Sequence, residues 1–422
     1  MKKLIALLLA AVMVLALAAC GSTATESSAP AGTTSENEAA EATSADNTPT
    51  QEQLDAAAEA VEAVTEKLSA DGLGGYKVGL YYLPNVEGYG KAMFDYFDWL
   101  CDLTNCEPVH YEMTSFASSD IMAAVETLVS QGCDAIICVI GSSPSMFEYL
   151  NDNGVYYTLM TRSYTEEVCA VVLDSEYFCG FIGDLGGETG IEYLKGFGCA
   201  EALAAEGCKN IAIIMASEGE TMNDERTIGM QAAAEKYGMN VLTVVRGGDY
   251  ATGTSDILAS YGDVIDGLCT ASIDSSLAAL QSADMVGYVK LACVDAPSDP
   301  VGFLEAGYCS AFTNEGAGFM ALMYMQMFNA MTGADRLFDT DKIVPQFPGI
   351  IITSVDTYKL IEAANEKVQG CFTPNEILSL NSIIAPGMSV AEREEMLAGW
   401  CTDEYWNIPM ITARVNAYAD AA

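Results

Sequence analysis

The chain has 422 residues, enough for two or more domains that each bury a core. Its 59 acidic residues outnumber its 18 Lys and Arg, which gives a formal net charge of −41. That charge argues against partners that need a basic surface, such as nucleic acids and anionic membranes. An acidic, solvated surface fits a soluble protein body, and by itself it indicates no ligand.

The first twenty residues have the pattern of an export signal. Lys2 and Lys3 precede a short apolar run, which ends in the small residues Ala18 and Ala19 before Cys20. The run is too short for a permanent transmembrane helix. Its end resembles the lipobox of bacterial lipoproteins, which implies cleavage before Cys20 and lipidation of that residue. The alternative is an ordinary secretory signal with a chance cysteine, and both place the mature chain outside the cytoplasm.

A tether is predicted between this signal and the rest of the chain. Residues 21–53 contain no Leu, Ile, Val or aromatic side chain, so the segment cannot bury enough surface to fold. As a flexible coil it would reach roughly 30 Å. Residues 54–70 have helical spacing and predict a short amphipathic helix. We therefore assign 1–19 to a signal peptide and 20–75 to the lipidated cysteine, tether and short helix.

From residue 76 onward, apolar runs of strand length alternate with helical patterns. The first block predicts strands at 78–83, 108–113, 135–140 and 155–160, with helices at 90–103, 119–131 and 145–153. A connection at 168–181 leads to strands at 211–215, 241–245, 267–271, 289–294 and 308–313, with helices at 188–205, 222–237, 255–260 and 275–285. Alternation of this kind predicts parallel sheets covered on both faces. Two successive blocks favour an α/β protein with two doubly wound lobes and a cleft between them.

A helix at 318–331 is rich in Met and Phe. It is too short to span a membrane and is predicted to be a buried core helix. Residues 356–422 have no firm assignment and are expected to pack on the second lobe.

Four segments carry a resemblance to a known family. Residues 130–137, Ser-Gln-Gly-Cys-Asp-Ala-Ile-Ile, are similar to the "QGVDAIII" step of the ribose-binding-protein-like, type I periplasmic solute receptors of ABC transporters. Residues 153–162, 225–230 and 291–295 are similar to that family's "AGIPVVTVDR", "RERGEGF" and "VVGFD" segments, in the same order. The resemblance covers about 76–353. It implies one lobe of 76–176 and 314–343, a second of 177–313 and 344–422, and a hinge with three crossings.

Candidate ligand contacts follow from strand ends and from the resemblance. Ligands of open α/β sheets bind beyond the carboxyl ends of the strands. Two of only six arginines fall there, and an Arg fork can hold two hydroxyls or a carboxylate. The candidate residues are Glu87, Tyr89, Ser142, Arg162, Arg226, Ser272, Asp295 and Asn314. Local salt bridges for the arginines, a turn or N-cap for Asp295 and helix-start packing for Tyr89 are the alternatives. Thr161, where the family has Asp, argues against ribose itself.

The resemblance implies a lipid-anchored protein that captures a small solute, most simply a sugar, and delivers it to an ABC permease. No cofactor, metal or catalytic residue is expected. Two other functions stay open: a sensor that presents the ligand to a membrane receptor kinase, and a secreted enzyme. The sequence has no GxSxG, HExxH or P-loop motif, and its only histidine, His110, falls on a predicted strand. Most cysteines lie in apolar runs and are expected in the core, although Cys101 and Cys106 are close enough to bridge.

Overall fold

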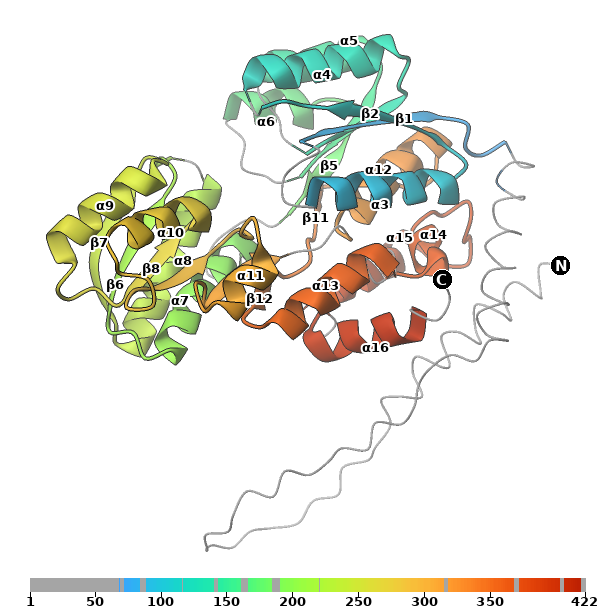
Figure 1. Ribbon diagram of the computed structural model, residues 1–422. Coiled ribbons are helices and arrows are strands. Elements are labelled where there is room, and N and C mark those ends of the chain that lie inside the picture. Colours follow the sequence, from blue (N-terminus) through green and yellow to red (C-terminus); the bar gives the residue numbers. More distant parts are fainter. Residues whose placement is uncertain are drawn as a thin grey trace, which may run out of the picture. The chain divides into compact units, whose positions relative to one another are not determined.

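The computed structural model describes residue 68 and residues 72–83, 89–115, 117–139, 143–160, 166–183, 190–219, 221–314, 318–367, 372–402 and 406–418. Within these residues the chain forms two six-stranded sheets flanked by helices (Figure 1). The predicted α/β class with two doubly wound lobes is therefore confirmed.

The first sheet has the strand order β11-β5-β4-β3-β1-β2, and all its pairings are parallel. Its strands are β1 (Lys77–Tyr82), β2 (Glu107–Glu112), β3 (Ala135–Cys138), β4 (Tyr156–Leu159), β5 (Phe178–Ile182) and β11 (Ile343–Val344). Its helices are α3 (Tyr89–Leu103), α4 (Ser118–Ser130), α5 (Pro144–Asp152), α6 (Glu166–Leu173) and α12 (Met320–Thr332). Figure 1 shows α4, α5 and α6 on one face of this sheet and α3 and α12 on the other. Consecutive side chains of a strand point to opposite faces, so Ile136 and Ile137 enter different core clusters.

The second sheet has the order β12-β10-β9-β8-β6-β7, in which only β12 runs antiparallel to its neighbour. Its strands are β6 (Asn210–Met215), β7 (Asn240–Arg246), β8 (Gly267–Thr270), β9 (Lys290–Cys293), β10 (Ala311–Asn314) and β12 (Ile350–Ile352). Its helices are α7 (Ile191–Ala205), α8 (Thr221–Tyr237), α9 (Tyr250–Tyr261), α10 (Ile273–Ser282) and α11 (Pro300–Glu305). Side chains of α7 and α8 share one core cluster with β6, and those of α9 and α10 pack on its other face.

The chain passes between the two sheets three times. It leaves the first sheet after β5, returns through α12 after β10, and leaves again between β11 and β12. This order confirms the predicted three-crossing connection.

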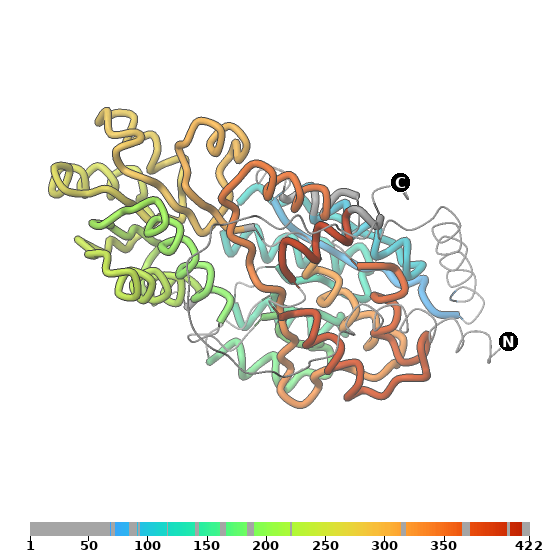
Figure 2. Tube along the Cα trace, turned by 90° about the horizontal axis from the view of Figure 1, so that it is seen from below, coloured from blue at the N-terminus to red at the C-terminus, as the bar shows by residue number. Residues whose placement is uncertain are grey.

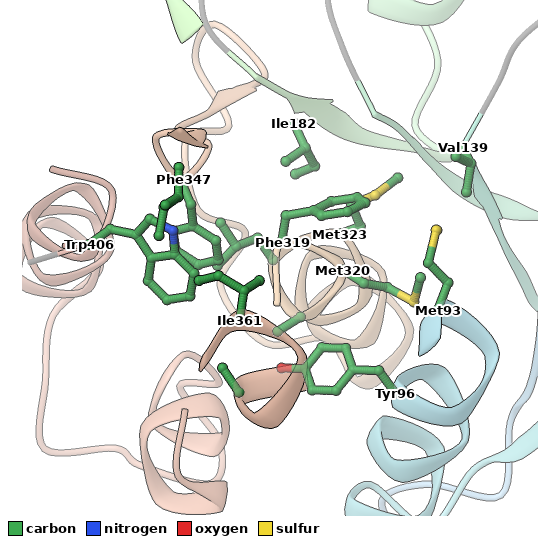
Figure 3. Packing of buried hydrophobic residues seen from close by; sticks show 14 of the residues in the cluster. Met93, Tyr96, Val139, Ile182, Phe319, Met320, Met323, Phe347, Ile361 and Trp406 are labelled. Atoms are coloured by element: carbon green, nitrogen blue, oxygen red, sulfur yellow. The ribbon is translucent and has the colours of Figure 1, made fainter. Parts of the chain in front are cut away.

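Helix α12 is the central core helix of the first sheet. All ten side chains from Met320 to Asn329 are buried, and the Tyr324 hydroxyl hydrogen-bonds Thr104, the residue just after α3. Figure 3 shows Met320 pointing toward Met93 of α3, with Met323 beneath Ile182 of β5. The prediction of a buried core helix is confirmed. None of the described helices is both long enough and apolar enough to cross a membrane.

Several sequence expectations are wrong. The supposed connection at 168–181 contains most of α6 and most of β5, because its apolar residues pack in the core of the first sheet. A lobe boundary at 177 therefore falls too early. Helix α9 starts before the expected 255, since Asp249 accepts a hydrogen bond from the Thr252 amide and caps the helix. Helix α11 was not expected at all.

The C-terminal segment consists of α13 (Val355–Lys367), α14 (Pro374–Ser379), α15 (Val390–Trp400) and α16 (Ile408–Tyr418). It was expected on the second lobe, but much of it packs on α12 of the first. Asn329 of α12 donates to the Leu380 carbonyl at 3.0 Å, and Asn381 donates to the Asn329 side chain at 3.0 Å. Figure 2 shows this red segment beside the orange α12. Helix α13 contacts both α3 and α11. Aromatic side chains drive this packing, since Phe347 stacks on Trp406 with ring centroids 4.8 Å apart (Figure 3).

Candidate functional site

Three predicted site residues stand in line at one edge of the second sheet. Thr270 of β8 pairs with Cys293 of β9, and Cys293 pairs with Phe312 of β10. Ser272, Asp295 and Asn314 each stand two residues beyond these partners. The register of three neighbouring strands thus brings the three positions together at the carboxyl edge, where ligands of α/β sheets bind.

Arg226 of α8 joins this edge through a set of ionic contacts. Its Nη1 lies 3.5 Å from Oδ2 of Asp295, and its Nε donates to Oε2 of Glu192 on α7. Nζ of Lys195 donates to the other oxygen of the Glu192 carboxylate at 2.8 Å. We refer to Glu192, Lys195, Arg226 and Asp295 as the charge cluster.

Burial differs sharply across the charge cluster. The side chain of Lys195 is 2% exposed and that of Arg226 is 8% exposed, whereas that of Asp295 is 55% exposed. Asp295 is therefore the member most open to a solute, with the guanidinium of Arg226 beneath it. A local salt bridge, the alternative for Arg226, is present, but its arginine is buried rather than on the surface.

The pKa values of the cluster follow from burial and pairing. Burial opposes ionisation of Glu192, but the positive charges of Lys195 and Arg226 outweigh it and lower the pKa of that carboxyl. Burial also opposes the charged form of Arg226, and the carboxylates of Glu192 and Asp295 outweigh it, so its pKa is raised. For Lys195 burial is the larger effect, and its pKa is lowered despite Glu192.

Two glycines let α7 and α8 approach closely enough for these contacts. A Cβ at Gly196 of α7 would lie 2.0 Å from the Arg226 carbonyl oxygen. A Cβ at Gly229 of α8 would lie 2.0 Å from the Tyr193 carbonyl oxygen. No larger residue fits at either crossing point without separating the helices. Gly196 lies one helical turn after Glu192 on α7, so the close approach places the Arg226 backbone beside that turn. The Arg226 side chain is then within reach of the Glu192 carboxylate.

The remaining predicted residues are described only in part. Ser272 lies just before α10, and its hydroxyl donates to Ser275 at 3.0 Å. Tyr89 is the first residue of α3, and Asn314 is the last residue of β10, paired with Ile350 of β12. Glu87, Ser142, Arg162 and the lipidation candidate Cys20 lie outside the described residues. The pairing of Arg162 with Arg226 across two lobes therefore stays a prediction.

Sequence reasoning missed three residues near this edge. Glu192 and Lys195 form an i,i+3 pair in the first turn of α7, a pattern that occurs widely in so acidic a chain and gave no signal. Tyr82 is the last residue of β1 in the first sheet. Burial raises the pKa of Tyr82 to about 12, and the Asp295 carboxylate adds to this shift. Tyr82, at the carboxyl end of β1, therefore lies close enough to Asp295 for the charge of that carboxylate to affect it.

The described residues give little support for a disulfide, a reactive thiol or a metal site. All twelve described cysteines are free, and ten are buried, so Cys101 and Cys106 form no bridge. Burial raises the pKa of the Cys133 thiol to about 12, which disfavours the reactive thiolate. His110 contacts Asp98 at 2.6 Å and packs against Phe94. In the described part of the chain, no three His, Cys, Asp or Glu side chains group as metal ligands.

Solved structures with this fold are numerous. An ABC transporter periplasmic solute-binding protein from Actinobacillus succinogenes 130z, with bound D-allose, matches with a TM-score of 0.55 and 14% identity over 67% of this chain and 99% of its own. A galactofuranose-binding protein matches at 0.54 and 12% over 69% of this chain and 98% of its own. A periplasmic ribose ABC transporter protein from Conexibacter woesei DSM 14684 matches at 0.51 and 16% over 69% of this chain and 96% of its own.

The chain has the fold of the type I periplasmic solute-binding proteins. No protein-family model matches its sequence, and no curated protein matches it significantly. About a third of this chain has no counterpart in these structures. By contrast, this chain matches nearly the whole length of each of those proteins. The bound D-allose is a property of the Actinobacillus succinogenes protein.

Proposed function

We propose that this chain is an extracytoplasmic solute-binding protein that captures a sugar at the carboxyl edges of its two sheets and delivers it to an ABC permease. The observation that carries the proposal is the pairing of Arg226 with the exposed Asp295 at that edge, on a fold shared with transport proteins that bind sugars. Those structures also favour binding over catalysis. Hinge closure around the ligand, as in other two-lobed binders, would complete the capture.

The Arg226–Asp295 pair suits a hydroxyl group in particular. A hydroxyl donates one hydrogen bond and accepts others, so a single sugar hydroxyl can donate to Asp295 and accept from Arg226. Hydrogen bonds to charged groups contribute about 1.5–3 kcal/mol each. Because the two groups already face each other, little reorganisation is needed when the ligand arrives.

Binding tests this proposal directly. A thermal-shift screen over pentoses, hexoses, polyols, nucleosides and amino acids should find a sugar that raises the melting temperature, because the ligand binds only the folded state. Asp295→Asn, at an exposed position, should weaken binding of that sugar at least tenfold and leave the melting temperature of the free protein nearly unchanged. Arg226→Ala should weaken it as well.

The matched control is Arg414→Ala, which removes an arginine paired with Glu376 at 3.1 Å in the C-terminal segment. Its affinity for the sugar should equal that of the wild type. If Asp295→Asn and Arg226→Ala both kept full affinity for the sugar, the charge cluster would not be part of the binding site.

The lipid anchor is a separate part of the proposal and needs its own test. In a bacterial host the full chain should partition into the detergent phase of a Triton X-114 extraction, and Cys20→Ser should move it to the aqueous phase, since acyl chains hold the mature protein to the membrane. Equal partitioning of the two proteins would indicate that Cys20 is not lipidated and that the N-terminal segment is an ordinary secretory signal. Loss of labelled sugar uptake on gene deletion would favour delivery to a permease over presentation to a receptor.

A further inference from the structure

Glu192 is held between two cations beneath the exposed edge of the site. One carboxylate oxygen accepts from Lys195 and the other from Nε of Arg226. The side chains of Glu192 and Lys195 are only 13% and 2% exposed. Neither side chain is open enough to meet a solute as Asp295 does, so any effect on a ligand passes through Arg226 or through their charges.

The four members of the charge cluster have formal charges that cancel. Arg226 balances the exposed Asp295, and Lys195 balances the Glu192 carboxylate that orients the guanidinium. Without Lys195, the group that orients Arg226 would add a net negative charge to the site. Without Glu192, Arg226 and Lys195 would leave a net positive charge facing the same edge.

Packing fixes this arrangement in place. A Cβ at Gly349, in the third connection between the sheets, would lie 3.0 Å from Cγ and 3.1 Å from Cε of Lys195, so the backbone lies directly against the lysine stem. Gly196 brings the Arg226 backbone against α7 on the other side. The ammonium group therefore has little freedom to leave Glu192.

We propose that Glu192 and Lys195 are positioning residues that hold Arg226 in a charge-balanced setting, and that the site consequently selects neutral sugars over sugar acids of the same size. This inference rests on the proposed function, because it concerns the ligand class of that same site. It assigns a role to two residues that do not themselves meet the solute.

The geometry of Arg226 explains the selectivity. An arginine recognises a carboxylate best through two parallel N–H donors on one edge. In this site Nε is taken by Glu192 and Nη1 faces Asp295 at 3.5 Å. An incoming carboxylate would compete for these donors and would face the negative charge of Asp295. A neutral hydroxyl needs only one of these donors and is not repelled by Asp295, to which it can donate.

The test compares four matched pairs of ring-forming probes: D-glucose with D-glucuronate, D-galactose with D-galacturonate, D-mannose with D-mannuronate and L-gulose with L-guluronate. Wild type should bind the neutral member of at least one pair more tightly than its acid, by calorimetry at low salt. Glu192→Gln, which leaves a net positive cluster, should shift that ratio toward the acid about tenfold. Lys195→Gln should shift it away from the acid, and the double variant should restore the wild-type ratio.

The double variant and one control separate this role from a structural one. Damage to folding would weaken both members of a pair together and leave their ratio unchanged. Glu206→Gln changes the net charge equally at the far end of α7, roughly 20 Å away by helix length, and should not alter the ratio. If both single variants bound sugar with an unchanged ratio of neutral-sugar to acid affinity, this inference would be wrong and the proposed function would stand. Failure of wild type to bind any of the eight probes would overturn the inference and count against the proposed function itself.

Discussion

At the scale of single residues, buried charges in this chain are satisfied in two different ways. Arg226 is paired with carboxylates on α7 and after β9, whereas Arg393 of α15 is fully buried and donates to the Ser379, Met388 and Ala385 carbonyls. A buried guanidinium needs partners for its donors, and either solution supplies them. Arg393 therefore joins turns of the C-terminal segment, whereas Arg226 lies at the sheet edge of the candidate site.

The lowered pKa of Glu192 predicts a specific dependence of stability on pH. The folded state holds this carboxyl ionised more strongly than the unfolded chain does, so the unfolded state binds more protons in acid. Its stabilisation is present above the ordinary glutamate pKa of about 4.3 and is lost as the pH falls toward the lowered folded value. Denaturation followed between pH 6 and pH 3 should show a shallower loss of stability in Glu192→Gln than in wild type.

Glu206→Gln again supplies the comparison, because Glu206 only makes a surface contact with Lys290 at 3.8 Å. Its pH profile should follow the wild type. A Glu192→Gln profile that also follows the wild type would show that Glu192 is not the stabilising carboxylate in acid.

At the scale of elements, the crossing of α7 and α8 decides the geometry of the charge cluster. Each helix presents a glycine to the backbone of the other, Gly196 against Arg226 and Gly229 against Tyr193. Neither helix is strongly amphipathic by sequence near these positions, so periodicity alone gave no sign of the crossing. The contact is a property of the pair of helices.

Alanine at these two glycines is predicted to destabilise the second lobe. Each new Cβ would meet a backbone oxygen at 2.0 Å, which forces the helices apart, so Gly196→Ala and Gly229→Ala should each cost about 3 kcal/mol. Thermal unfolding should show a melting temperature lowered by several degrees. Sugar affinity should fall too, since Arg226 and Glu192 would separate.

Gly399 of α15 is the matched control, because a Cβ there meets nothing within 4 Å. Gly399→Ala should be neutral or stabilise by up to about 1 kcal/mol, as expected for alanine in an open helix. Equal stability of the Gly196, Gly229 and Gly399 variants would contradict the close crossing.

At the scale of the whole molecule, the C-terminal segment joins the core of the first lobe. Phe347, Trp400 and Trp406 form an aromatic group around Phe372, and Asn381 hydrogen-bonds α12. Helix α13 touches α3 and α11, which flank different sheets. The segment is thus part of the folded body.

Truncation of Trp406 tests this integration. Trp406→Ala should destabilise the protein by about 3–5 kcal/mol and expose apolar surface that binds the dye ANS. Trp406→Phe keeps the stacked ring and removes a buried indole N–H that has no partner within the described structure, so its cost should be under about 1.5 kcal/mol. Similar melting temperatures for the alanine variant and wild type would mean that the segment contributes little.

The fold was predictable where periodicity was strong. Strand β3, with its Ala-Ile-Ile-Cys run, and helix α12, with its Met-rich sequence, appear where the sequence placed them, because β3 is buried along its whole length and α12 from Met320 to Asn329. Strand β5 was missed although its five residues are all buried, and although the turn residues Asp174 and Ser175 separate it from α6. For the candidate site, only the common edge of Ser272, Asp295 and Asn314 was predictable, because the topology of parallel sheets brings neighbouring strand ends together; their role in binding stays a prediction.

The sequence by itself determined the α/β alternation, because that alternation depends on local pattern along the chain. The three passages between the sheets were implied by the family resemblance, and the export signal with Cys20 stays a prediction. The tertiary structure alone decided that Glu192 and Lys195 join Arg226, that two glycines set the helix crossing and that the C-terminal segment packs on α12. These depend on contacts between residues far apart in sequence. Charge pairing and close packing are decided by distance in space, which periodicity and composition do not encode.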